Sequence, residues 1–169
     1  MCRLGGHLVP VADRLAALLG RKVGRYHRLC EPSGVVTEDD VRQLALALPG
    51  AYEQTSYGRR PSWRTAPRMF AWLRDDPEAL VVWVEAVEDK EALIAADPVK
   101  FFTTPHYEGQ PIVLVRLEAI DAEEAAELIV DSWLFRAPPS LTRAVGDRRR
   151  LILTVTPPSR EDPGRRASE

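Results

Sequence analysis

The chain has 169 residues, of which 45% are hydrophobic and 28% charged, so it is long and apolar enough to bury one core. No uninterrupted run of about 18 apolar residues occurs, so the sequence predicts no membrane-spanning helix. The two cysteines, Cys2 and Cys30, lie outside the best-patterned part of the sequence, and no disulfide framework is expected. This composition favours a reducing cytoplasm.

Charge is unevenly distributed along the chain. Residues 1–35 carry 6 basic and 2 acidic side chains, giving +4, and residues 146–169 carry 6 and 4, giving +2. Residues 36–145 carry 11 basic and 19 acidic side chains, giving −8. The net negative charge of this middle segment opposes the approach of a polyanion such as nucleic acid.

The ends also differ from the middle in pattern, which predicts three segments. Residues 1–35 are interpreted as an N-terminal extension, either disordered or a start-site artefact with translation beginning near Val35 at a GTG codon. Residues 36–145 are the folded domain. Residues 146–169 are a basic, Pro- and Arg-rich tail with one β-like run at 151–155, and the rest of it is too polar to order itself.

The domain begins with a helix signal. Thr37 precedes three acidic residues, the pattern of an N-cap with an acidic first turn, and Val36 and Val41 are spaced as a hydrophobic staple. Apolar residues recur at helical spacing until Pro49 and Gly50 end the helix.

Strand signals follow a polar connection over residues 52–57. Residues 62–66 and 69–74 are β-prone runs joined at Pro67, which predicts a hairpin. Residues 79–85 form a third strand, and their apolar run lacks alternation, so this strand is expected to be central and covered on both faces.

The second half predicts a short helix, a strand and a long helix. The short helix spans residues 89–96, a loop covers 99–110, and the strand covers 111–117. Asp121 and Glu124 are spaced as a capping box for the long helix. Its buried stripe is Ala125, Leu128, Ile129, Ser132 and Trp133. Strands that cluster rather than alternate with helices predict an α+β fold: a two-layer, mostly antiparallel sheet with helices packed on one face.

An ordered set of short segments resembles the MmcQ/YjbR family over about 110 of the 169 residues. These segments are Leu46 to Gly50, Tyr57-Gly58, Phe70-Ala71, Leu80 to Val82, Asp97-Pro98, Phe101 to Tyr107, Val113 to Leu117 and Ser132-Trp133. The resemblance implies a layout similar to double-wing DNA-binding modules, and a family whose title includes DNA binding. This chain departs from the family pattern at Pro67-Arg68, where relatives have Gly-Lys, and at Trp83, where a lysine is common.

The hairpin is the candidate nucleic-acid site. Four arginines, Arg59, Arg60, Arg64 and Arg68, lie in a stretch from Gln54 to Leu73 that has no acidic residue. Tyr57 and Trp63 are interleaved with them and are available for base stacking if the bound strand is single. Weak, largely sequence-independent DNA binding is the expected function. The alternative is a solvated hairpin whose Trp63 belongs to the core.

A second hypothesis is a small-molecule or protein-partner binding module without nucleic-acid affinity. Its candidate residues are the aromatic side chains near strand ends and loops: Tyr57, Trp83, His106 and Tyr107.

An enzyme is not expected. The chain has no nucleophile elbow, phosphate-binding loop, dinucleotide fingerprint or zinc-ligand spacing. His7, His27 and His106 are too scattered to suggest a metal site, and neither cysteine has an evident activating neighbour. We therefore expect no catalytic residue, no metal and no cofactor.

Overall fold

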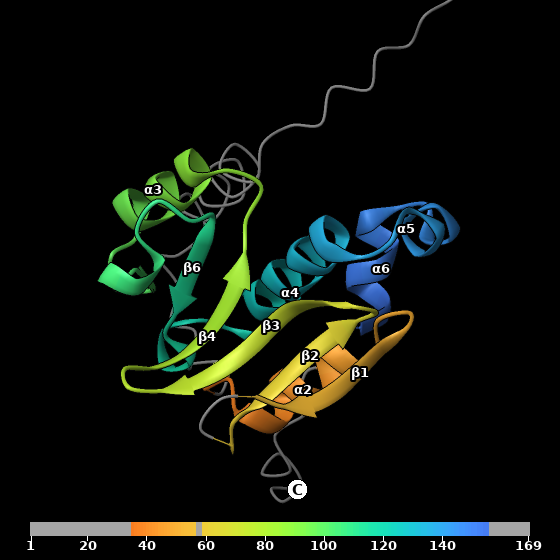
Figure 1. Ribbon diagram of the computed structural model, residues 1–169, viewed down its shortest axis with the longest axis horizontal. Helices are drawn as coiled ribbons and strands as arrows, with labels where there is room; N and C mark the ends of the chain where they lie inside the picture. Colours follow the sequence, from red (N-terminus) through yellow and green to blue (C-terminus); the bar gives the residue numbers. More distant parts are fainter. Residues whose placement is uncertain (1–34, 57–58, 156–169) are drawn as a thin grey trace, which may run out of the picture.

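The computed structural model describes residues 35–56 and 59–155. Its strands form one open antiparallel sheet in the order β1-β2-β3-β4-β6-β5 (Figure 1). They are β1 (Ala51–Thr55), β2 (Pro61–Thr65), β3 (Arg68–Asp75), β4 (Glu78–Trp83), β5 (Phe101–Phe102) and β6 (Ile112–Val115). The expected α+β class with an antiparallel sheet is confirmed. The interpretations of residues 1–34 and 156–169 lie outside the described residues.

The α-helices share one face of the sheet. The α-helices of the described part are α2 (Glu38–Leu46), α3 (Val87–Ala96), α4 (Ala122–Arg136), α5 (Pro139–Val145) and α6 (Arg148–Val155), with short 3-10 helices η2 (Pro105–Tyr107) and η3 (Leu117–Ala119). Helices α2, α3, α4 and α6 all contribute side chains to one apolar cluster. Helices α2 and α4 lie behind the strands in Figure 1. We call the opposite side, on which η2 places Tyr107, the helix-free face because it lacks the α-helices of the main cluster.

The two helix starts for which the sequence has capping signals are confirmed, whereas the short helix expected from residue 89 begins at Val87. The Thr37 hydroxyl accepts a hydrogen bond from the Asp40 backbone N–H at 3.3 Å, and the Asp40 carboxylate accepts one from Thr37 N–H at 2.9 Å. Asp121 and Glu124 make the same reciprocal pair at the start of α4. Local capping of the first-turn N–H groups therefore fixes where these helices begin.

Strand β4 is central, as its unbroken apolar run predicted. It lies between β3 and β6. Leu80 and Val82 belong to the main cluster under the helices, whereas Val81 belongs to a smaller cluster with Leu114 and Tyr107 on the helix-free face. Apolar groups therefore cover β4 from both sides.

Strand β1 was missed, because the sequence there predicted a polar connection. Four of its five residues are exposed, because β1 is the edge strand of the sheet. Backbone pairing with β2, rather than burial, makes this segment a strand. Gly50 leads into it with φ of 67°, in the left-handed region that glycine adopts without strain. The Cδ1 atom of Leu141 lies 2.8 Å from where a Cβ on Gly50 would be.

The expected strand at residues 151–155 is wrong, since this segment is helix α6. Leu151, Ile152 and Val155 are buried in the main cluster, and Leu153 on the other side of the helix is 74% exposed. Packing against α4 imposes the helix on a run whose composition is β-prone. The core therefore extends ten residues beyond the expected boundary at residue 145.

Candidate nucleic-acid interface

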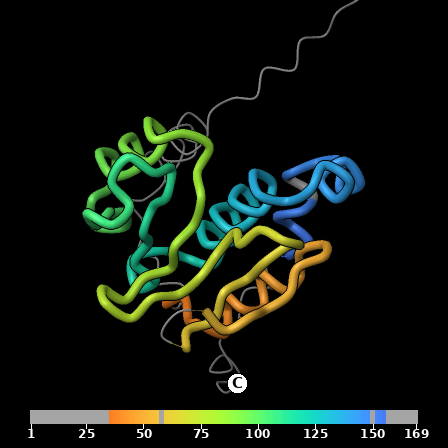
Figure 2. The backbone as a smooth tube through the Cα atoms, in the orientation of Figure 1, coloured from red at the N-terminus to blue at the C-terminus, as the bar shows by residue number. Residues whose placement is uncertain are grey.

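The β2–β3 hairpin determines where the expected arginines lie. Its strands pair Arg64 with Met69 and Thr65 with Arg68, and the turn consists of Ala66 and Pro67, so the hairpin is confirmed. Trp63 and Thr65 are buried on the helix side, so alternation places Arg64 on the helix-free face. The turn lies at the same end of the sheet as the end of α4 and helices α5 and α6 (Figure 2).

Trp63 is a core residue. Its side chain is fully buried in the main cluster, and its Nε1–H donates to the Glu53 carboxylate at 3.0 Å. It cannot present a ring face to a base. The alternative interpretation of the sequence, in which Trp63 belongs to the core, holds for this residue.

Arg60 is occupied by carboxylates. Its guanidinium lies 3.2 Å from the Glu38 carboxylate at the start of α2 and 3.0 Å from that of Asp75 at the end of β3. Arg59, beside it, is exposed and has a left-handed φ of 69°. The structure thus separates two neighbouring arginines that the sequence grouped with the hairpin, and directs Arg60 towards the acidic first turn of α2.

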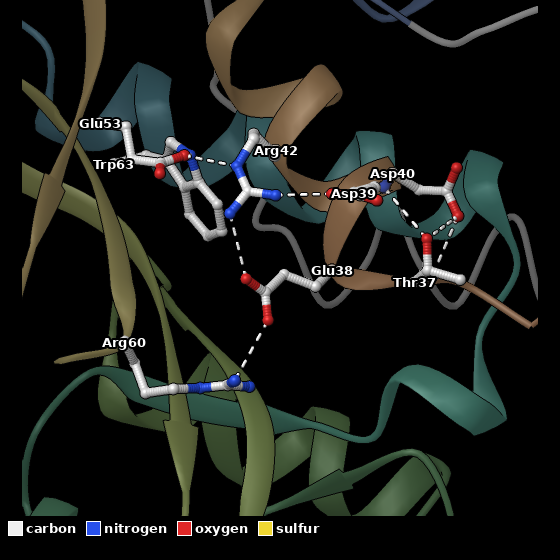
Figure 3. Close-up of polar contacts among 8 residues, drawn as sticks. All are labelled: Thr37, Glu38, Asp39, Asp40, Arg42, Glu53, Arg60 and Trp63. Atoms are coloured by element: carbon white, nitrogen blue, oxygen red, sulfur yellow. Dashed lines mark hydrogen bonds and ion pairs between the residues drawn. The ribbon is translucent and has the colours of Figure 1, made fainter. Parts of the chain in front are cut away.

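The same acidic turn holds a second arginine, as Figure 3 shows. Arg42 donates to Glu53 at 2.9 Å, to Asp39 at 2.6 Å and to Glu38 at 3.1 Å. The hydrogen bond with Glu53 raises the pKa of Arg42, and the neighbouring negative charges add to the effect against a smaller opposing effect of burial. These ion pairs place positive charge beside the acidic first turn of α2, and the net charge of −8 already counts both partners.

Arg64 and Arg68 lie next to the hairpin turn and, unlike Arg60, have no carboxylate partner among the described residues. Arg64 is half-buried, and its Nη2 lies 3.9 Å from the Met69 sulfur. Arg68 is exposed at the hairpin turn. Within the described part of the chain, neither guanidinium lies within 4.0 Å of a carboxylate.

Arg136, in the last turn of α4, joins them and was missed by the sequence interpretation. Its Nε donates to the Met69 carbonyl at 3.2 Å, and its guanidinium carbon lies 4.1 Å from the centre of the Trp83 ring. Burial lowers the pKa of Arg136, and the positive charge of Arg68 lowers it further. We call Arg64, Arg68 and Arg136, which surround Met69, the hairpin arginine cluster.

The residues of the small-molecule hypothesis are only partly brought together. His106 packs edge-on against Tyr107, with ring centres 4.7 Å apart. The ring centres of Tyr107 and Trp72 lie 6.1 Å apart. Trp83 borders the same small apolar cluster, but Arg136 covers its ring. Tyr57 lies outside the described residues.

The structure of residues 35–56 and 59–155 also bears on metal binding and on membrane crossing. No group of three or more His, Cys, Asp or Glu side chains there is arranged to hold a metal ion. In the same part of the chain, every helix is too short or too polar to cross a bilayer.

The fold and the arginine cluster define a small α+β domain with a basic hairpin at one end of its sheet. The YjbR family model matches residues 46–135, so the chain belongs to the YjbR family, as the sequence resemblance indicated.

Two kinds of relative support this assignment. Uncharacterised proteins from Mycobacterium tuberculosis and Mycobacterium bovis are 37% identical over 127 residues, which cover 65% of this chain and 95% of each relative. The crystal structure of DR2400 from Deinococcus radiodurans, a protein with a DUF419 domain, is similar with a TM-score of 0.55. It is 26% identical, and the match covers 69% of this chain and 88% of that one.

Proposed function

We propose that this YjbR-family domain binds nucleic acid through the hairpin arginine cluster, without catalysing a reaction. The observation that carries the proposal is the convergence of arginines on Met69, whose sulfur lies 3.9 Å from Arg64 Nη2 and whose carbonyl accepts from Arg136 Nε at 3.2 Å. Arg68 precedes Met69 in the chain, and among the described residues no carboxylate lies within ion-pair distance of these three arginines. A bound phosphate would supply the opposite charge that the three arginines lack.

The geometry of Arg136 supports phosphate as the ligand. Its guanidinium is held against Trp83 and anchored through Nε, which leaves the two terminal nitrogens without a hydrogen-bond partner in the described residues. A planar guanidinium with fixed orientation matches the oxygen atoms of a phosphate and loses little side-chain entropy on binding.

The net charge of −8 over residues 36–145 is the main argument against the proposal, and the placement of the carboxylates weakens it. The carboxylates in ion pairs are held by Arg42, Arg60, Lys100 and Arg148, and none of them lies within 4.0 Å of an arginine of the cluster. Salt screens exposed charges over about 8 Å at physiological ionic strength, so a local cluster can attract a phosphate despite distant carboxylates. Because arginine contacts to phosphates carry no sequence information, the binding should be largely sequence-independent.

The test is a fluorescence-anisotropy titration of a short labelled DNA with the full-length protein. The variant replaces Arg64, Arg68 and Arg136 with Gln. A matched control replaces Arg42, Arg60 and Arg143 with Gln, so that both proteins lose the same charge. The proposal predicts at least about tenfold weaker binding for the first variant and a small change for the control. Equal loss in both variants would mean that net charge, not the cluster, decides binding.

The small-molecule or protein-partner function predicts a different pattern. Aromatic compounds would raise the thermal stability of the protein, and DNA would bind neither variant nor wild type at low salt.

A further inference from the structure

The register of the sheet determines which side chains share the helix-free face. One row of directly opposed residues crosses all the described strands: Gln54, Ser62, Trp72, Val81, Leu114 and Phe102. The next opposed pair on this face is Tyr52 with Arg64. Each of them lies two residues along its strand from the Gln54–Ser62 pair. Arg74 lies two residues along β3 from Trp72, on the same face.

This face differs in charge from the rest of the domain. The carboxylates carried by the described strands are Glu53, Asp75 and Glu78, and alternation turns each of them to the helix side. Glu53 binds Trp63 and Arg42 there, and Asp75 binds Arg60. The strand residues of the helix-free face therefore present arginine without carboxylate, although residues 36–145 are acidic overall.

Aromatic side chains lie next to these arginines. Tyr52 is 42% exposed and sits directly opposite Arg64 on the edge strand. Trp72 is half-buried and packs at one side against Tyr107, whose ring lies 5.7 Å from the guanidinium carbon of Arg74. Opposed side chains on paired strands are about 5 Å apart, and residues two apart along one strand are about 7 Å apart on the same face. Tyr52 with Arg64 and Trp72 with Arg74 therefore form two aromatic–cationic pairs on this face, on either side of the register shift beside Arg64.

We propose that the helix-free face selects single-stranded nucleic acid, with bases stacked on Tyr52 and Trp72 and phosphates bound by Arg64 and Arg74. This inference rests on the proposed function, because Arg64 belongs to both surfaces. In a duplex the bases are stacked on one another and cannot stack on side chains of this face. In a single strand every base has a free ring face, and stacking on an aromatic side chain contributes about 1–3 kcal/mol per base.

The test uses the full-length protein and anisotropy titrations with a labelled single strand and with the matching duplex. Tyr52→Leu and Trp72→Leu remove the rings, and Tyr52→Phe and Trp72→Phe keep them. Each Leu variant should bind the single strand about fivefold or more weakly and the duplex almost unchanged, and each Phe variant should bind as the wild type does. Binding should also quench tryptophan fluorescence, and Trp72→Phe should reduce the quenching.

The Tyr52→Leu variant is expected to fold, because Tyr52 is exposed on an edge strand and the loss of its ring leaves no cavity. Wild-type affinity in both Leu variants, with binding lost in the variant of the hairpin arginine cluster, would overturn this inference and leave the proposed function standing. A concentration-dependent dimer that Tyr52→Leu abolishes would also overturn it, since the face would then bind a second copy. If the wild type binds neither probe at low salt, the proposed function fails.

Discussion

The Ser132 hydroxyl of α4 donates a hydrogen bond to the Phe70 carbonyl of β3, with 2.5 Å between the oxygens. The same oxygen accepts a hydrogen bond from the Trp83 backbone N–H of β4 at 2.8 Å. The last opposed pair at this end of the β3–β4 ladder is Ala71 with Val82, so Ser132 bridges the strands where their own pairing stops. Helix α4 thereby fixes the position of the strand segment that follows the hairpin turn.

Replacing Ser132 with Ala should strongly destabilise the domain. Two buried backbone groups would lose their partner, at about 1–3 kcal/mol each. We expect a loss of about 2–4 kcal/mol in the free energy of unfolding, measured by urea denaturation. Ser140→Ala, at an exposed position in α5, is the matched control and should change stability by less than about 0.5 kcal/mol. Near-wild-type stability of Ser132→Ala would contradict the bridging role.

Arg136→Lys should show whether the flat guanidinium matters beyond its charge. Lysine keeps the positive charge but cannot stack on Trp83 in the same way or present a planar fork to phosphate. DNA affinity should fall by about threefold to tenfold, with the unfolding free energy reduced by about 1 kcal/mol from the lost cation–π and hydrogen-bond contacts. Arg143→Lys, on the exposed side of α5, should leave both quantities unchanged.

Arg60→Gln should separate Arg60 from the arginines that bind phosphate. Its partners are Glu38 and Asp75, so the substitution breaks two partly exposed ion pairs and costs no more than about 1 kcal/mol of stability. DNA affinity should change by less than about twofold, whereas Arg68→Gln should reduce it clearly. An equal loss of affinity in the two variants would show that Arg60 leaves its carboxylates to contact DNA.

Ending the chain after residue 147 should destabilise the domain, because α6 is part of the core. Leu151, Ile152 and Val155 would leave the main cluster, and Asp131 would lose its bidentate partner Arg148. Burying each such side chain contributes about 1.5–3 kcal/mol, so we expect a loss of at least about 3 kcal/mol in urea denaturation. A chain ending after residue 155 is the control and should unfold like the full-length protein.

Sequence reasoning succeeded where the causes are local. Capping residues such as Thr37 and Asp121 determine helix starts through neighbouring N–H groups, and the turn at Pro67 joins two β-prone runs. It failed at β1 and α6, where tertiary context decides. Strand β1 has an exposed, polar sequence that becomes a strand by pairing, and α6 is a β-prone run made helical by packing on α4.

The candidate site was predicted in part, for the same reason. Arg64 and Arg68 follow from the hairpin pattern, but Trp63 could be assigned to a face only after the sheet register was known. Arg136 is 67 residues from Met69 in the sequence and reaches the Met69 carbonyl only because α4 ends beside the hairpin. Its one local signal is its position as a basic residue in the last turn of a long helix.

The most direct test of the account is the salt dependence of DNA affinity in the wild type and in the variant with Arg64, Arg68 and Arg136 replaced by Gln. Each phosphate neutralised contributes about 0.9 to the slope of log affinity against log salt concentration on duplex DNA. If all three arginines contact phosphates, the wild-type slope should be steeper than the variant's by roughly 2.7. Parallel slopes with comparable affinities would show that the cluster does not contact phosphate and would contradict the account.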